Sequence, residues 1–361
     1  NGPAGEAYFT LESATAQQRL QELQSLVTFS YVAPVLRLYT EALMGQPLLL
    51  RSTAELPPGL HLAGRDLPTS DGRAIFVPEE VGDFATERDN FAAYKVAILH
   101  QVGRYECGTF QFALAECCTR LPHLRAALSL PESALAQVDA FTPFFAAFPE
   151  PALARSLFTV LEDARIDASM ARRYKGIQRD LALVMAHSLR ARPVLPGLPL
   201  RQALLEGLLQ CTLGLDLKAA EALPPLLRVL LPRLCQRLAP LASPAATVYD
   251  TAAAVLDCYL LIAQIPLSAL STAAVDAVVS LESVLAQLPD DADSLLLADM
   301  FRQAGAEADM MPTLPESDEP ASGIEPVPYR GEVKPELIQQ TMRLQELAEE
   351  LSALEQSVNP L

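Results

Sequence analysis

The sequence predicts a mainly α-helical protein, built as a multi-helix bundle with one small β-hairpin, an acidic Pro-rich linker and a C-terminal helix. Half of its 361 residues are hydrophobic and none is Trp. Leu and Ala dominate, which is typical of packed helices rather than of a β-sandwich. Apolar residues also recur at helical spacing along most of the chain. A chain of this length can bury a sizeable core.

The helical body is expected to occupy residues 1–303. Thr86 and Asp89 resemble a capping box, so a helix should begin there and run to about Arg104. The full set of predicted helices is 13–28, 33–44, 86–104, 110–119, 131–138, 151–174, 180–190, 200–213, 219–241, 245–265, 267–288 and 290–303. Because these segments follow no fixed period, they do not indicate a solenoid.

A short β-hairpin is predicted near residues 60–78. Two extended apolar runs, 60–62 and 74–77, lie on either side of the pair Asp71-Gly72. An Asp-Gly pair between such runs is a hairpin signal. This hairpin should be a minor feature on the helical body.

The C-terminal part divides into a linker and a helix. Residues 304–335 are rich in Pro and acidic side chains, so we expect a linker or an extended segment on the surface. Residues 336–361 form an amphipathic helix with a heptad-like stripe of Leu337, Leu344, Leu347, Leu351, Leu354 and Val358. This helix needs a partner surface. It either folds back onto the body or forms a hinge to a further domain.

The charge and composition exclude several classes of function. A formal charge of −17 and a pI near 4.7 disfavour general binding to nucleic acid or to an anionic membrane, because both need a cationic surface. The most apolar stretch, 252–281, is interrupted by Asp257, Gln264 and Pro266, so no membrane span is predicted. The six cysteines lack metal-finger spacing and are expected to be reduced. A cytoplasmic location is expected.

The most informative motif is His100-Gln101-x-x-Arg104, followed by Glu106. His100 and Arg104 lie four residues apart, which is the ligand spacing of a His-Glu-x-x-His zinc site. Gln101 would then replace the general base and Arg104 the second ligand. Gln cannot accept a proton and an Arg cation repels a metal, so we expect neither a metal site nor catalytic residues.

A second charged run lies at residues 157–167 and contains Glu162, Asp163, Arg165 and Asp167. We hypothesise that Arg104 pairs with Glu162 or Asp163, because an Arg–carboxylate pair could hold two helices in register. Two interpretations of the run remain open. It is either a solvated or salt-bridged helix face, or a polar network that contacts a partner.

Together these two motifs resemble the helical pair that precedes the von Willebrand factor A domain in the CbbO/NorD family. The stretch Tyr329-Arg330-Gly331-Glu332 is similar to the entry to that family's closing segment. The resemblance covers residues 90–176 well and 329–351 moderately. The structural or partner motif that it outlines comprises His100, Gln101, Arg104, Glu106, Glu162, Asp163, Arg165 and Asp167.

The resemblance implies an adaptor that is not itself an enzyme and works with a hexameric MoxR-type AAA+ ATPase of the CbbQ/NorQ kind. The implied client is Rubisco, as in CbbO-type activation; the alternative is nitric oxide reductase, as in NorD-type maturation. The sequence has no nucleotide-binding loop and no Asp-x-Ser-x-Ser motif. No cofactor is therefore expected in this chain, and the divalent ion is expected only in an A domain. A degenerate zincin-like helical scaffold is the remaining alternative.

Overall fold

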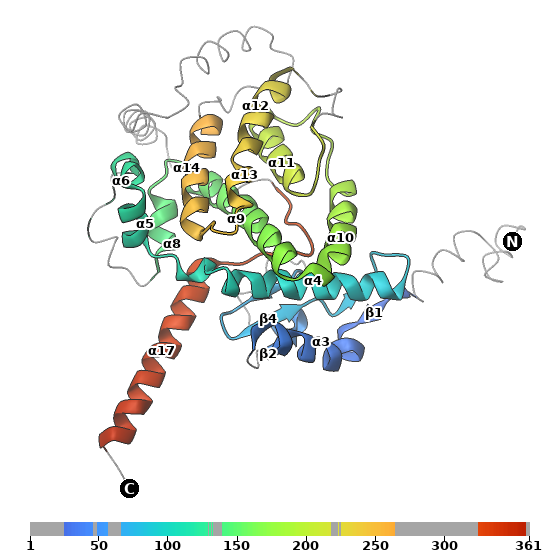
Figure 1. Ribbon diagram of the computed structural model, residues 1–361, viewed down its shortest axis with the longest axis vertical. Coiled ribbons are helices and arrows are strands. Elements are labelled where there is room, and N and C mark those ends of the chain that lie inside the picture. The colour runs from blue at the N-terminus through green and yellow to red at the C-terminus, as the bar shows by residue number, and fades with distance from the viewer. Residues whose placement is uncertain are drawn as a thin grey trace, which may run out of the picture. The chain divides into compact units, whose positions relative to one another are not determined.

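The computed structural model is mainly helical, with one two-stranded and one three-stranded sheet, as the sequence predicts (Figure 1). It describes residues 25–45, 49–56, 66–128, 139–217, 225–263 and 324–358, together with the single residues 130, 132 and 223. The chain divides into two compact units. Unit 1 comprises Asn1–Gly103, Arg173–His187 and Pro326–Val333, and unit 2 comprises Arg104–Arg172, Ser188–Glu325 and Lys334–Leu361.

The three-stranded sheet of unit 1 contains the hairpin predicted at Asp71-Gly72. Strand β3 (Thr69–Ser70) runs antiparallel to β4 (Ala74–Val77). Asp71 Oδ1 accepts hydrogen bonds from the backbone N–H groups of Arg73 and Ala74 at 2.8 Å, and Gly72 takes a φ of 90° that favours glycine. The run at 60–62 lies outside the described residues.

Two further pairings in unit 1 were not predicted. Strand β2 (Leu49–Ser52) pairs in parallel with β4, and β1 (Val27–Thr28) pairs antiparallel with β5 (Glu80–Val81). The prediction of a helix through Thr28 is therefore wrong at its end. Val27 and Thr28 are β-branched residues that suit a strand, and helix α3 (Phe29–Met44) begins directly after them.

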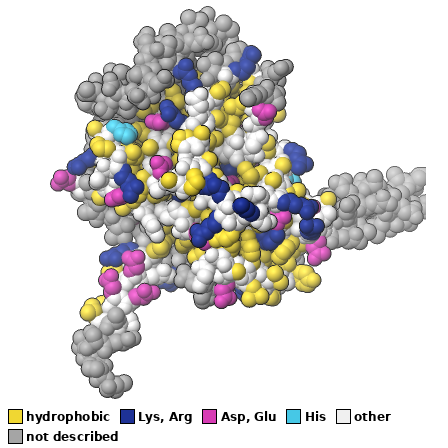
Figure 2. Space-filling view, viewed as in Figure 1, with side chains coloured by type: hydrophobic (Ala, Val, Ile, Leu, Met, Phe, Trp, Pro, Cys, Tyr) yellow, Lys and Arg dark blue, Asp and Glu magenta, His cyan; other side chains and the backbone are white. Residues whose placement is uncertain are grey.

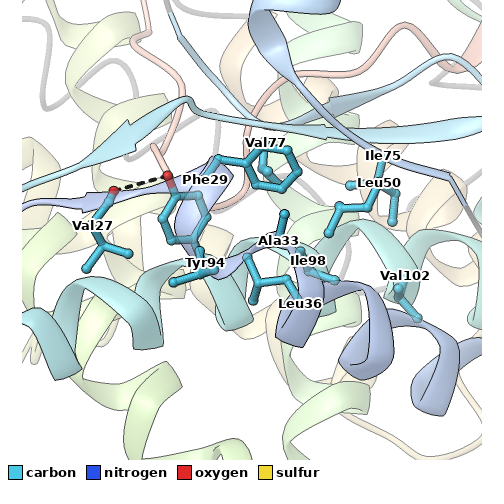
Figure 3. Close-up of a cluster of buried hydrophobic side chains, with 11 residues drawn as sticks. Val27, Phe29, Ala33, Leu36, Leu50, Ile75, Val77, Tyr94, Ile98 and Val102 are labelled. Carbon is cyan, nitrogen blue, oxygen red and sulfur yellow. Dashed lines mark hydrogen bonds between the residues drawn. The ribbon is translucent and has the colours of Figure 1, made fainter.

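Helices α3 and α4 (Glu87–Glu106) enclose the apolar core of unit 1 with the sheet (Figure 3). Leu36, Ile75 and Ile98 are fully buried there. Thr86 caps α4 as predicted, since its hydroxyl accepts from the Asp89 N–H at 3.1 Å and donates to the Asp89 carboxylate at 2.8 Å. These two hydrogen bonds stabilise the N-terminus of α4.

Unit 1 also takes in the chain after helix α9 (Pro151–Arg173). The short helix η3 (Lys175–Ile177) and most of α10 (Gln178–Arg190) belong to it. Lys95 on α4 forms an ion pair with Asp180 on α10. The rings of Phe84 and His187 lie 4.5 Å apart. These contacts place α10 alongside α4.

The elements described in unit 2 are helices. They are η2 (Thr109–Gln111), α5 (Leu114–Arg120), α6 (Pro122–Leu128), α8 (Phe141–Ala146), α9 (Pro151–Arg173), α11 (Leu200–Thr212), α12 (Pro225–Gln236), α13 (Leu238–Leu241), α14 (Val248–Ala263) and α17 (Pro335–Val358). The helix predicted at 219–241 breaks at Arg237, because Pro240 has no N–H to bond the carbonyl one turn before it. The predictions at 267–288 and 290–303, and nearly all of 131–138, lie outside the described residues.

Stacked and edge-on phenylalanine rings fill part of the core of unit 2. The Phe112 and Phe141 rings stack with centroids 4.9 Å apart, and Phe144 meets Phe112 edge-on at 5.3 Å. Phe158 of α9 packs against the Phe141 ring at 5.3 Å. Across the described ranges, none of the helices has the length and apolar character needed to cross a bilayer.

The described end of the predicted linker is part of unit 1. Residues 304–323 lie outside the described residues, but Pro326–Val333 belong to unit 1. Tyr329 and Arg330 are buried, and the Glu332 N–H donates to the Pro68 carbonyl at 3.2 Å. The prediction of a linker or surface segment is therefore wrong for these residues. An aromatic ring and the long aliphatic stem of an arginine supply the apolar area that the rest of the segment lacks.

Candidate functional site

Helix α4 carries the residues of the first motif, and all three of its polar positions are buried. His100, Gln101 and Arg104 are each at most 2% exposed. Buried polar groups require hydrogen-bond or charge partners, because desolvation without them costs free energy. The partners of these three side chains therefore define what the motif does.

Arg104 forms a buried ion pair with α9. Its Nη2 lies 2.8 Å from Asp163 Oδ1, and the two side chains are only 3% and 4% exposed. Asp163 is one of the two carboxylates that the sequence indicated as partners of Arg104. The pair therefore ties the last turn of α4 to the middle of α9 within unit 2.

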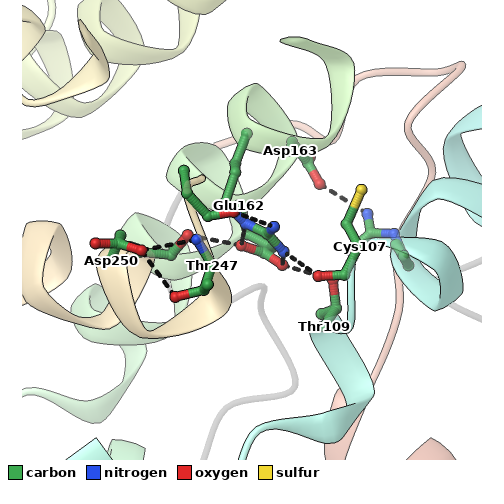
Figure 4. A network of polar contacts seen from close by, with 10 residues as sticks. Cys107, Thr109, Glu162, Asp163, Thr247 and Asp250 are labelled. Atoms are coloured by element: carbon green, nitrogen blue, oxygen red, sulfur yellow. Dashed lines mark hydrogen bonds and ion pairs between the residues drawn. The ribbon is translucent and has the colours of Figure 1, made fainter. Parts of the chain in front are cut away.

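Glu162 is the centre of a second buried group (Figure 4). Arg165 donates to both of its oxygens, from Nε at 2.9 Å and from Nη2 at 2.5 Å. The hydroxyls of Thr109 and Thr251 donate at 2.5 Å and 2.7 Å. Burial alone would raise the pKa of Glu162, but these donors and the charge of Arg165 outweigh it and hold the pKa below its ordinary value.

Arg165 extends this group to neighbouring segments of unit 2. Its Nη2 donates to the Cys107 carbonyl at 3.1 Å and its Nη1 to the Ala246 carbonyl at 3.3 Å. The first contact holds the turn after α4, and the second holds the approach to α14. Nearby, the Asp250 carboxylate accepts from the N–H and hydroxyl of Thr247, both at 2.7 Å (Figure 4).

The charged run on α9 is therefore interior and salt-bridged, and the solvated-face interpretation is wrong. Glu162, Asp163 and Arg165 are at most 3% exposed. Asp167, one turn beyond Asp163, is also buried. Glu106, the last residue of α4, is half-buried. Glu162 can be buried because Arg165 of the same helix neutralises it and two hydroxyls bond it, and Asp163 can be buried because Arg104 of α4 neutralises it.

In unit 1, the other two residues of the first motif contact the stretch that includes Tyr329. Gln101 Nε2 donates to the Arg330 carbonyl at 2.8 Å. The rings of His100 and Tyr329 meet edge-on, with centroids 6.1 Å apart. His100 and Gln101 thus position the segment that returns to α4 from a distant part of the chain.

Gly331 is required at this return for a steric reason. Its φ of 67° lies in the left-handed region, and a Cβ built on it would lie 1.8 Å from the Pro68 carbonyl oxygen. Any side chain at this position would displace backbone. The Arg330-Gly331 pair is therefore fixed by the close approach of two backbone segments in unit 1.

These residues do not fit a zinc site despite the spacing of His100 and Arg104. Arg104 presents a cation that Asp163 already neutralises. The Gln101 amide donates to a backbone carbonyl and has no acid–base capacity. Within the part of the chain that the structure describes, no group of three or more His, Cys, Asp or Glu side chains could hold a metal ion.

Some residues of the site were not identified from the sequence. Thr109 lies three residues after Glu106 at the end of the first motif, but its role depends on Glu162, which is distant in sequence. Gln339 on α17 donates to the carbonyls of Phe110 and Phe112 at 2.9 Å and 2.8 Å, and accepts from the Ala140 N–H at 2.9 Å. A single Gln or Thr has no sequence pattern that would reveal such contacts.

No family model, curated protein or solved structure matches this chain. What the site can do chemically is therefore inferred from its own side chains and their contacts. The lowered pKa keeps Glu162 ionised near neutral pH, whereas a general acid requires a raised pKa. Its oxygens also already accept from Arg165, Thr109 and Thr251. The group is suited to holding helices together.

Proposed function

We propose that the chain is a non-catalytic adaptor of a MoxR-type AAA+ ATPase, of the CbbO/NorD kind. One observation carries this proposal. The residues on which the family resemblance rests are those that make the buried polar contacts of α4. Arg104 meets Asp163 within unit 2, and Gln101 meets Arg330 within unit 1. Because these motif residues are buried and bonded within the fold, we regard the motif as structural.

A mechanical role is consistent with this chemistry. An adaptor must transmit remodelling by an ATPase ring without losing the register of its own helices. Buried, hydrogen-bonded ion pairs resist sliding, because each displacement would leave a charge without its partner. The Arg104–Asp163 pair meets this requirement, because it joins α4 to α9. The Glu162–Arg165 pair lies within α9 and is bonded to other segments through the hydroxyls of Thr109 and Thr251. We assign no catalytic residue and no cofactor to this chain.

The proposed partner is a hexameric ring of the CbbQ/NorQ type, in the cytoplasm. The net charge of −17 would favour docking onto a basic face of such a ring. The proposed client is Rubisco, and the alternative is nitric oxide reductase. A divalent ion would be used only by a von Willebrand factor A domain, as the resemblance implies.

The test is reconstitution with the MoxR ATPase encoded nearest to this gene. We expect the protein and the hexamer to co-elute in size-exclusion chromatography and the ATPase rate to rise. Binding should weaken as salt increases, since opposite charges attract less when screened. Activity assays with inhibited Rubisco and with immature nitric oxide reductase would then distinguish the clients. Failure of the protein, joined to its A domain, to bind or stimulate the ring would overturn the proposal.

A degenerate zincin-like scaffold is the second candidate, favoured only by the spacing of His100 and Arg104. Metal analysis of the purified protein tests it directly. Stoichiometric zinc that disappears in His100→Ala would refute the non-metal interpretation. We expect no bound zinc in either protein, because Arg104 occupies the second ligand position as a cation.

A further inference from the structure

Among the described side chains of helix α17, those that are buried lie near its start. Ile338 and Gln339 are buried in unit 2, where Gln339 bonds three backbone groups. Further along, Leu344, Leu347 and Leu351 are 64%, 40% and 61% exposed. Large apolar side chains that are exposed singly are common, but a row of them on one helix indicates an interaction site.

The spacing of these leucines identifies the kind of surface. Leu344 and Leu351 lie seven residues apart and both occupy heptad position a. Leu347 lies three residues after Leu344 and occupies position d. A stripe made only of a and d positions is the narrow seam of a coiled coil. A helix that rests on a globular body usually has a wider apolar face. The partner should therefore be a helix.

The charges beside the stripe indicate what charge the partner helix should carry. In the heptad register Glu350 lies at position g, next to the stripe, and Glu346 and Glu349 lie at positions c and f, away from it. Acidic side chains gather on the described part of α17 (Figure 2). Arg343 lies 2.9 Å from Glu346, so its charge is already matched. Among the described residues, Glu349 and Glu350 have no ion-pair partner. Because Glu350 is the flanking charge without an ion-pair partner, a partner with basic flanks is favoured, and a second copy of α17 aligned in parallel would bring acidic positions together.

We propose that the exposed stripe of Leu344, Leu347 and Leu351 is a docking site for a basic amphipathic helix of another protein. This inference goes beyond the adaptor function and does not depend on it. The stripe extends from Leu337, and the 14 residues to Leu351 span roughly 21 Å at 1.5 Å per residue. A partner helix of three heptads would cover it.

The experiment uses the whole protein and two synthetic three-heptad peptides. Both peptides carry Leu at a and d; one carries Lys at e and g and the other Glu. Fluorescence anisotropy at low salt should show binding of the Lys peptide at least tenfold tighter than binding of the Glu peptide. Equal affinity for the two peptides, or no binding of either, would overturn the proposal.

Variants locate the binding surface. Leu347→Asp with Leu351→Asp should weaken binding of the Lys peptide at least tenfold, and Glu350→Lys should reduce the preference for it. Leu38→Asp is the matched control, because Leu38 is 67% exposed on α3 in unit 1 and should leave binding unchanged. Circular dichroism checks that each variant is folded. Sedimentation as a dimer that Leu351→Asp dissociates would instead identify a second copy as the occupant.

Discussion

Helices α9 and α17 distribute their side chains in opposite ways. On α9, Glu162 and Asp163 are buried at 0% and 3% exposure, whereas on α17 Leu344 and Leu351 are more than half exposed. The difference shows that partners, and not residue type alone, decide burial in this protein. A buried charge or an exposed apolar row is informative because both oppose the usual preference.

The two helices accordingly serve different purposes. Each carboxylate at the centre of α9 has a cation within hydrogen-bond distance, so α9 contributes to the register of unit 2. The leucines of α17 contribute little to the fold, because they remain in contact with solvent. Substitutions on α9 should therefore affect stability, and substitutions on α17 should affect binding.

The largest effect is expected at Glu162. Glu162→Ala leaves the buried Arg165 cation without its carboxylate, and loss of one member of a buried pair costs about 3–5 kcal/mol. Urea unfolding followed by circular dichroism measures this loss. If Glu162→Ala does not fold, Glu162→Gln should still fold with a reduced free energy of unfolding, because the amide retains one acceptor for Arg165 and the hydroxyls.

The control for Glu162 is Glu116→Gln on α5. Glu116 pairs with Arg120 on the surface, and exposed pairs contribute only about 0–1 kcal/mol. If Glu116→Gln lowered the free energy of unfolding as much as Glu162→Gln, the comparison between buried and exposed sites would be contradicted.

The pH dependence of stability should identify the charged form of Glu162. Its folded pKa lies below the ordinary value of 4.5, so its stabilising contribution is present above pH 4.5 and is lost as pH falls through the folded pKa. Glu162→Gln should therefore lose less stability than the unsubstituted protein on acidification below pH 4.5. Identical acid unfolding profiles would show that Glu162 is not ionised in the fold.

A smaller effect is expected for the Arg104–Asp163 pair, and a double-mutant cycle isolates it. Arg104→Met and Asp163→Leu should each lower the free energy of unfolding by about 3 kcal/mol, because each removes the opposite charge from a buried ion pair. The double variant should be less destabilised than the sum of the two. Additive losses in urea unfolding would mean that the two side chains do not interact.

Local sequence signals predicted much of the fold. The capping pair Thr86 and Asp89 fixed the start of α4, and Asp71-Gly72 fixed the position of a hairpin. Pairings over longer distances were missed, because no local signal indicates that β2 pairs in parallel with β4, a strand far from it along the chain. Helix boundaries also failed where β-branched residues entered a strand, as at Val27 and Thr28.

For the candidate site, the sequence predicted only that side chains of opposite charge from the two motifs would pair. Arg104 was predicted to pair with Glu162 or Asp163, and its partner is Asp163. Nothing local indicated that Glu162 would be buried, because burial depends on Thr109 and Thr251, which reach it from other segments. Tertiary contacts of single polar residues have no period in sequence.

Gln339 lies where α17 changes from buried to exposed, and its substitution should have an intermediate effect on the free energy of unfolding. Gln339→Ala removes three hydrogen bonds to backbone groups of unit 2, and unsatisfied buried groups should cost about 2 kcal/mol in total. Gln340→Ala, the next residue on the same helix, is the control. Hydrogen exchange should be faster at the Ala140 N–H, which loses its acceptor, in Gln339→Ala alone.

The smallest effect on stability is expected on the stripe itself. Leu344→Ser with Leu351→Ser should change the free energy of unfolding by no more than about 0.5 kcal/mol, as for most exposed substitutions. The matched control is Leu161→Ser on α9, where the leucine is fully buried and its loss should cost at least about 2 kcal/mol. A comparable cost at Leu344 and Leu351 in urea unfolding would mean that α17 packs against the rest of the protein in solution. The contrast with α9 would then no longer hold.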